Sequence, residues 1–168
     1  MHGAIQKFLR EVEWGNLDYL VVDLPPGTGD VQLSLAQSIP LTGAVVVTTP
    51  QDVALMDVRR AVSMFAKVKV PILGLIENMS TFTCPACGAE TPIFRRGGGR
   101  LAAERMGCAF LGELPLVAGV CEAGDAGVPI VVREATGPAA QAFVHVARQV
   151  AARISVVTVE GAPAFIGW

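Results

Sequence analysis

Residues 23–30 read Asp-Leu-Pro-Pro-Gly-Thr-Gly-Asp and follow the apolar run Tyr-Leu-Val-Val at residues 19–22. This pattern predicts a buried strand over residues 18–23 that ends in a carboxylate and opens into a Pro/Gly turn. Such a turn presents backbone N–H groups and a hydroxyl at the strand end, which is a common way to build a nucleotide-phosphate site. Asp23 could hold Mg²⁺ there, directly or through water. The plainer alternative is an ordinary strand and turn, with Asp30 capping the next helix.

The phosphate-binding half of such a site is missing from the sequence. A phosphate-binding loop ends in Gly-Lys followed by Ser or Thr, and that string does not occur in the 168 residues. The Gly-rich stretch at residues 97–99 is followed by Arg100 and does not match it. If residues 23–30 belong to a nucleotide site, the sequence contains its magnesium side without the phosphate cradle.

Length and composition predict a single domain with a well-buried core. The 168 residues are 52% hydrophobic and only 17% charged, which argues against disorder. A formal net charge of −2 gives no bulk electrostatic reason to bind nucleic acid or an anionic membrane. The apolar runs are shorter than the roughly 20 residues of a membrane span. We therefore expect neither nucleic acid nor membrane as a partner.

Apolar strands alternate with amphipathic helices along the first half of the chain. The predicted strands cover residues 18–23, 43–49 and 70–76, and the predicted helices cover residues 5–12 and 30–38 and begin again at Asp52. Strands that are apolar throughout and separated by helices imply an α/β fold with a parallel sheet covered on both faces. Right-handed crossovers place the strand ends at one edge, where ligands bind. The loops at residues 24–30, 50–52 and 77–80 fall on that edge.

The second half is less regular. Residues 81–99 contain prolines, glycines and a Cys-Pro-Ala-Cys string, and are predicted to form an irregular insertion. The further predicted elements are a helix at 101–106 that stops at Gly107, a strand at 108–111, a Gly-rich loop through Pro129, and a last helix from Pro138. Residues 155–168 have no clear period and are expected to form a poorly ordered tail after a domain over 1–154.

The pair Cys84 and Cys87 has the spacing of metal ligands. A tight turn, favoured by Pro85 and Gly88, directs both sulfurs toward one metal. Zinc and iron–sulfur clusters normally need four ligands, and a twofold dimer would supply the other two from a second copy. From spacing alone, half a zinc site, an iron–sulfur site, a redox dithiol and a metal-free structural pair all remain open.

Several ordered blocks resemble the Mrp family of iron–sulfur cluster carriers, within the MinD/ParA class of P-loop ATPases. The resemblance covers roughly residues 5–152, and Cys84 and Cys87 fall where that family carries its cluster-binding pair. The matching blocks are residues 17–30, 48–52, 77–80, 84–87, 111–115 and 125–131. This likeness implies the parallel-sheet fold of those ATPases, incomplete at the N-terminus because the Walker A loop is absent. The chain is thus expected to be the C-terminal part of a carrier and to hydrolyse no ATP alone.

The resemblance also implies roles for individual residues. Asp23 would be the Walker B carboxylate that helps to hold Mg²⁺, and Gly27 the switch glycine near the γ-phosphate of ATP, in a loop that Pro26 helps to shape. Asn78 would hydrogen-bond the adenine base, and Pro115 and Leu116 would lie beside it. Cys84 and Cys87 would hold a [4Fe–4S] cluster shared across a homodimer.

The expected function is ATP-dependent transfer of a labile [4Fe–4S] cluster to apo iron–sulfur proteins, with assembly factors as further partners. The expected location is the cytoplasm, or the mitochondrial matrix if the protein is eukaryotic. Two alternatives stay open. One is a MinD/ParA-like regulatory ATPase that does not need Cys84 and Cys87. The other is a zinc-stabilised binding module without catalysis.

Overall fold

A computed structural model describes residues 2–25 and 29–160 of the chain. The elements in chain order are α1 (His2–Glu11), α2 (Asp30–Ser38), β1 (Ala44–Thr48), α3 (Asp52–Lys67), β2 (Ile72–Glu77), β3 (Phe82–Thr83), β4 (Glu90–Thr91), α4 (Gly98–Arg105), β5 (Phe110–Glu113), α5 (Ala118–Asp125), α6 (Ile130–Arg133) and α7 (Pro138–Glu160). Strands β1, β2 and β5 form a parallel sheet in the order β1-β2-β5, and β3 and β4 form a separate antiparallel hairpin.

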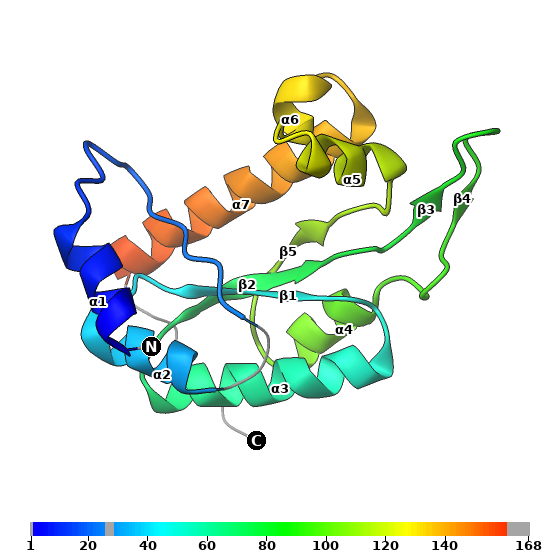
Figure 1. The fold of residues 1–168 in the computed structure, drawn as a ribbon. Helices are drawn as coiled ribbons and strands as arrows, with labels where there is room; N and C mark the ends of the chain where they lie inside the picture. Colours follow the sequence, from blue (N-terminus) through cyan, green and yellow to red (C-terminus); the bar gives the residue numbers. More distant parts are fainter. Residues whose placement is uncertain (1, 26–28, 161–168) are drawn as a thin grey trace.

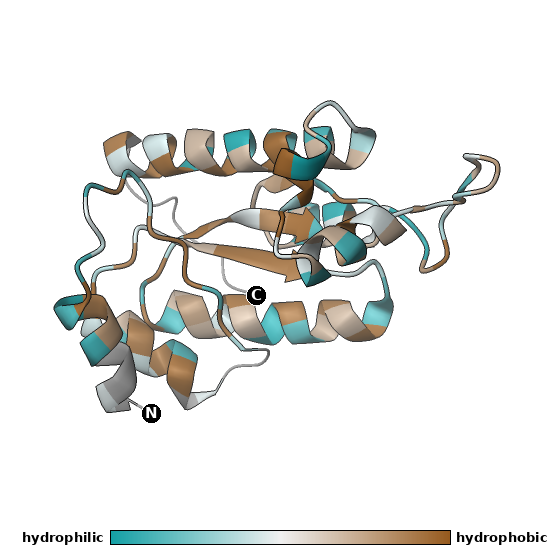
Figure 2. Cartoon of the chain, turned by 45° about the horizontal axis from the view of Figure 1, so that its top comes forward, coloured by the Kyte–Doolittle hydropathy of each residue, from teal (hydrophilic) through white to brown (hydrophobic). Residues whose placement is uncertain are grey.

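Helices cover both faces of the parallel sheet (Figure 1). Helices α3 and α4 pack on one face against β1 and β2, and α7 packs on the other face against β5 and β2. This is the layered α/β fold expected from apolar strands alternating with helices. The hydropathy colouring shows hydrophobic strands in the middle layer (Figure 2).

Strand β2 is the centre of the core. All six of its residues are buried, because it has a strand on each side and helices above and below. Leu75 joins the cluster under α3 and α4, with Val62 and Ala103. Ile76 points the other way and joins Leu111 and Val146 under α7. Alternate side chains of one strand therefore fill both halves of the core.

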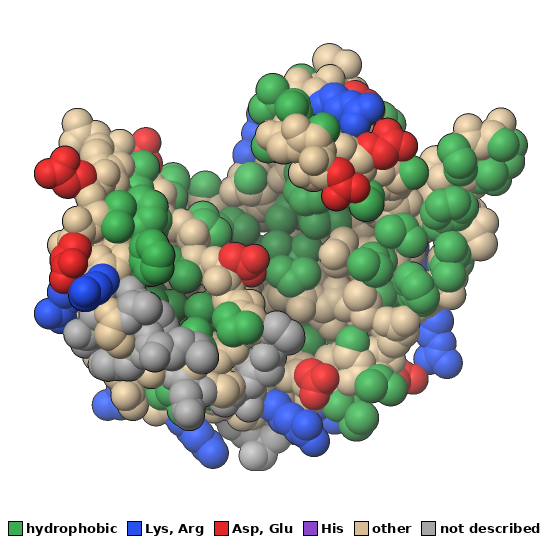
Figure 3. All heavy atoms as spheres, in the orientation of Figure 1, with side chains coloured by type: hydrophobic (Ala, Val, Ile, Leu, Met, Phe, Trp, Pro, Cys, Tyr) green, Lys and Arg blue, Asp and Glu red, His purple; other side chains and the backbone are tan. Residues whose placement is uncertain are grey.

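The predicted strand at residues 18–23 is absent from the structure, and that prediction is wrong. The segment is extended coil, and Val21 is 89% exposed. A strand needs a hydrogen-bonded neighbour, and β1 is the edge strand of the sheet, paired with β2 and with no second described strand. Hydrophobic side chains gather along this segment, beside a hollow that separates it from the α5–α6 lobe (Figure 3).

Two further predictions need correction. The expected Gly-rich loop before Pro129 contains α5, and α6 follows directly after it. Residues 155–160, expected to begin a disordered tail, are the last turns of α7, where Val157 is buried. No Gly or Pro interrupts the helix here, and Ser155 and Thr158 sit inside it with their hydroxyls bonded to carbonyls four residues earlier. Residues 161–168 lie outside the described residues.

Helix α7 is also the one described helix whose length and composition would suffice to cross a membrane, over Pro138–Val159. The core helix of a soluble protein passes the same test when it is mostly buried, whereas 11% of this window is buried. Here one side of α7 packs on β2 and β5 through Val146.

Candidate functional site

The carboxyl ends of the three parallel strands bring several predicted residues together. The N–H of Asn78, just after β2, donates to the carbonyl of Thr48 at the end of β1 (2.7 Å). The N–H of Leu114, just after β5, donates to the carbonyl of Glu77 (2.8 Å). Asn78 and the Pro115–Leu116 pair therefore lie at one edge of the sheet, as the parallel topology predicts.

Asn78 is half-buried at this edge. Its side-chain Oδ1 accepts a hydrogen bond from the N–H of Met79 (2.9 Å). Met79 has a φ of 57°, an uncommon conformation for a residue with a side chain. The short side-chain bond holds the turn after β2 and leaves the two amide hydrogens of Asn78 as donors for another group.

The residues predicted to form the magnesium side of a nucleotide site are placed differently. Asp23 is exposed and follows extended coil, so no strand fixes the orientation of its carboxylate. Pro26 and Gly27 lie outside the described residues. The neighbouring Pro25 carbonyl accepts a hydrogen bond from Nε2 of Gln32 in α2 (2.7 Å), which attaches the start of the predicted phosphate turn to that helix.

Cys84 and Cys87 lie in the turn between β3 and β4. The two strands and this turn, residues 82–91, project away from the sheet (Figures 1 and 2), and we refer to them as the cysteine hairpin. The Cys84 N–H donates to Ala89 O (2.9 Å), and the Gly88 N–H donates to Cys84 O (2.8 Å). Gly88 has a φ of 72°, which glycine adopts without strain. Cys84 is half-buried and Cys87 is exposed.

Hydrogen bonding favours the thiolate form of Cys84. The backbone N–H of Ala86, then that of Cys87, and then the Cys87 thiol lower the pKa of Cys84 from its ordinary value. A thiolate is the form that binds metals. Within the described part of the chain, no group of three or more His, Cys, Asp or Glu side chains could hold a metal ion. One copy of the hairpin therefore offers two sulfurs for a cluster that normally takes four ligands.

The other two cysteines lie elsewhere. Cys108 is half-buried before β5, with its Sγ 3.7 Å from the Ala103 carbonyl oxygen, and burial raises its pKa. Cys121 is exposed on α5, with its Sγ 3.9 Å from Oδ2 of Asp125. Neither belongs to the hairpin.

The outgoing arm of the hairpin is bonded to the segment that follows β5. Both the N–H and the hydroxyl of Ser80 donate to Leu114 O, at 3.1 and 3.2 Å. The Leu116 N–H donates to Thr81 O (2.7 Å). The residues next to Asn78 and those expected to border the base thus form one backbone ladder, which continues into β3.

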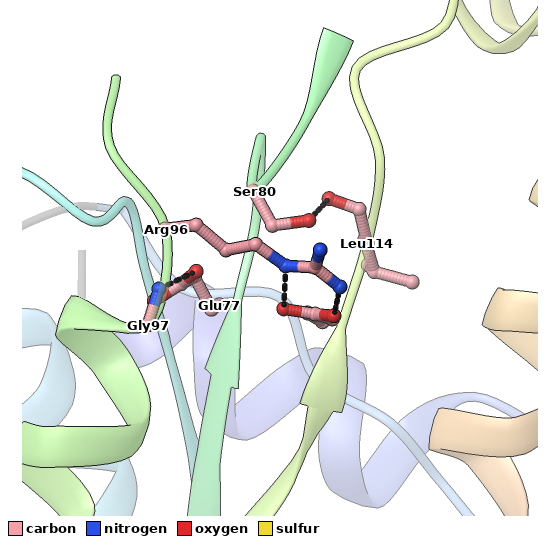
Figure 4. A network of polar contacts seen from close by, with 6 residues as sticks. Glu77, Ser80, Arg96, Gly97 and Leu114 are labelled. Carbon is pink, nitrogen blue, oxygen red and sulfur yellow. Dashed lines mark hydrogen bonds and ion pairs between the residues drawn. The ribbon is translucent and has the colours of Figure 1, made fainter. Parts of the chain in front are cut away.

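The return segment, residues 92–97, is bonded to the ends of β2 and β5 (Figure 4). The carboxylate of Glu77 accepts a hydrogen bond from the N–H of Gly97 (2.8 Å). The guanidinium of Arg96 donates two hydrogen bonds to the carboxylate of Glu113, and the one from Nε is 3.2 Å long. This pair lowers the pKa of Glu113 and raises that of Arg96. Sequence reasoning assigned no role to these three side chains. The sequence did contain a signal for the role of Glu77. This residue ends an otherwise apolar strand, and a buried carboxylate needs hydrogen-bond donors.

Comparisons with known proteins agree with these features. Residues 1–151 match the family described as ParA: NUBPL iron-transfer P-loop NTPase. The iron–sulfur cluster transfer protein NUBPL of Mus musculus is 52% identical over 151 residues, which are 90% of this chain and 47% of that protein. The iron–sulfur cluster carrier protein of Deinococcus radiodurans is 53% identical over 163 residues, 97% of this chain and 46% of its own length. The chain spans about half the length of these relatives.

Solved structures share the fold. A nucleotide-binding protein of Archaeoglobus fulgidus in complex with ADP superposes with a TM-score of 0.71 at 39% identity, covering 84% of this chain and 57% of that one. The septum site-determining protein MinD of Pyrococcus horikoshii gives a TM-score of 0.64 at 22% identity, covering 97% of this chain and 59% of its own, which supports the fold alone. The family match, the relatives and the fold agree with one another, and the chain belongs to the NUBPL-type iron-transfer P-loop NTPase family.

Proposed function

We propose that this chain is the cluster-holding part of an ATP-dependent iron–sulfur carrier. In this proposal Cys84 and Cys87 bind a labile [4Fe–4S] cluster as cargo, shared with the same pair of a second copy, and pass it to apo iron–sulfur proteins. The observation that carries the proposal is the placement of both cysteines in the exposed turn of a projecting hairpin. There they are open to a second copy and to an acceptor, whereas a resident cofactor is more often enclosed.

The nucleotide roles belong to the same proposal. Asn78 would recognise the adenine through its free amide donors, beside Pro115 and Leu116. Asp23 would hold Mg²⁺ and Gly27 would meet the γ-phosphate, in a complete site that also requires a phosphate-binding loop. The hydrogen bonds from Asn78 to Thr48 and from Leu116 to Thr81 support the base-binding part.

Assembly factors are further proposed partners. The proposed location is the cytoplasm, as for a bacterial carrier, or the mitochondrial matrix. The similar proteins include bacterial carriers and a protein of Arabidopsis thaliana, 50% identical over 147 residues, that is named as an iron–sulfur protein required for NADH dehydrogenase, mitochondrial.

Anaerobic reconstitution with iron and sulfide tests the cluster proposal. The wild-type chain should develop a broad absorbance at about 400 nm, typical of cysteine-ligated clusters, and should transfer the cluster to an apo-ferredoxin. The Cys84→Ala, Cys87→Ala variant should develop none. Cys121→Ala is the matched control, because it removes an exposed thiol outside the hairpin. A cluster that survives loss of Cys84 and Cys87, or a chain that takes zinc and no iron, would contradict the proposal.

A further inference from the structure

We propose that Glu77 is a positioning residue that fastens the return segment of the cysteine hairpin to the strand ends of the sheet. The proposal rests on the proposed function, because it concerns how the cluster-holding turn is linked to the nucleotide edge. Glu77 is the last residue of β2, and its side chain is 0% exposed. A carboxylate buried to this extent is costly unless hydrogen-bond donors surround it.

The donors come from the start of α4. One carboxylate oxygen accepts from the Gly97 N–H (2.8 Å) and the other from the Gly99 N–H (2.6 Å). The first N–H groups of a helix have no partner within the helix. Gly97 occupies the N-cap position of α4 and has no side chain to supply one. Glu77 therefore caps α4 from another element and joins the helix to the centre of the sheet.

The glycines at 97–99 allow this approach. A Cβ on Gly98 would lie 2.4 Å from the carbonyl oxygen of Pro50, and a Cβ on Gly99 would lie 3.1 Å from Oε2 of Glu77. The helix start thus packs directly on the turn after β1 and on the Glu77 carboxylate. This gives a physical role to the Gly-rich stretch that does not match a phosphate-binding loop.

Both arms of the hairpin are therefore attached to the proposed nucleotide edge. The return segment is attached through Glu77, which immediately precedes Asn78. The outgoing arm is attached through the bonds of Ser80 and Thr81 to Leu114 and Leu116. Because these connections are short and hydrogen-bonded, any displacement of Asn78 or Leu116 by a bound nucleotide would be passed to the turn that carries Cys84 and Cys87.

Amide hydrogen exchange on the 168-residue chain directly tests the attachment of the return segment to Glu77. The variants are Glu77→Ala and Glu77→Gln, and the control is Glu104→Gln on the exposed side of α4. In Glu77→Ala the Gly97 and Gly99 amides should exchange about tenfold to a hundredfold faster, because each loses a charged acceptor, while β1 and β5 amides keep their protection. Glu77→Gln keeps one acceptor oxygen, so the amide of only one of the two glycines, Gly97 or Gly99, should exchange faster. Glu104→Gln should change neither.

Two results would overturn the proposal. One is unchanged exchange at Gly97 and Gly99 in Glu77→Ala. The other is loss of protection across the whole sheet in Glu77→Gln, which would make Glu77 a support of the core and not of the hairpin. After reconstitution, Glu77→Ala should hold as much cluster as wild type but transfer it to apo-ferredoxin at an altered rate. If the wild type loads no cluster, the proposed function fails, and the exchange result alone decides the positioning role.

Discussion

Replacement of Gly98 by Ala should destabilise the protein, although Ala is the better helix former. The added Cβ would lie 2.4 Å from the carbonyl oxygen of Pro50 and 3.1 Å from its carbonyl carbon. Both atoms are backbone, so α4 must shift by about 1 Å to restore ordinary contact. Overpacking of this kind costs about 1–3 kcal/mol, and the gain of Ala over Gly inside a helix offsets about 0.5–1 kcal/mol. We expect a net loss of about 1–2 kcal/mol in the free energy of unfolding.

Urea unfolding followed by circular dichroism measures this loss, and two other glycines serve as controls. Gly124 lies in α5 with nothing within 4 Å of its added Cβ, so Gly124→Ala should be neutral or stabilise by up to about 1 kcal/mol. Gly97 also has open space but a φ of 84°, so Gly97→Ala should cost about 1 kcal/mol through backbone strain alone. Equal stability of Gly98→Ala and wild type, or equal losses in Gly98→Ala and Gly124→Ala, would refute the close packing of α4 on Pro50.

Three other experiments have defined outcomes. Glu113→Gln should lower the free energy of unfolding by about 0.5–1 kcal/mol at neutral pH, because the pair with Arg96 is partly exposed. The pKa of Glu113 is lowered in the folded state. The stability difference between wild type and Glu113→Gln should therefore be fully present above the unfolded-state pKa of Glu113 and vanish as pH falls through its folded-state pKa. A stability difference that does not change with pH would contradict the ion pair. Val21→Lys should keep the free energy of unfolding within about 0.5 kcal/mol of the wild-type value and should reduce light scattering when the protein is concentrated. Leu75→Ala, in the core, should lower it by about 2–5 kcal/mol. A large loss in Val21→Lys would show that residues 18–23 are packed in solution. The 168-residue chain alone should release no phosphate from Mg–ATP, since its sequence contains no Gly-Lys-Ser/Thr loop; steady turnover that survives further purification would refute this.

The sheet and its covering helices could be predicted because their signals are local. The predicted strands at 43–49 and 70–76 correspond to β1 and β2, and the helix predicted over 30–38 has the bounds of α2. Continuous apolar runs between amphipathic helices leave few alternatives to a parallel sheet. The placement of Asn78 and Leu116 at the same edge of the sheet follows from this topology once the strand order is known.

Features that depend on distant partners could not be predicted. Residues 18–23 have the composition of a buried strand, but burial and pairing require a neighbour that the described chain does not place beside them. Gly119 and Gly124 favour a loop by propensity, yet α5 forms because Ala123 packs in a cluster with Ile130 and Ala139. Tertiary contacts outweigh local preference there.

The role of Glu77 shows the same limit at the site. Its place at the end of an apolar strand indicates a partnered carboxylate, but the partner amides lie 20 and 22 residues away at Gly97 and Gly99. The hairpin between them contains both cysteines. Sequence reasoning could single out the cysteine pair by its spacing as a candidate metal site, whereas the attachment of that pair to the sheet required the fold.

Native mass spectrometry of the anaerobically reconstituted protein decides whether two copies share one cluster through Cys84 and Cys87. We expect a species with the mass of two chains plus one [4Fe–4S] cluster, and its loss when Cys84 and Cys87 are replaced by Ala. A single chain that carries zinc, or a dimer that retains its cluster without those two thiols, would contradict it.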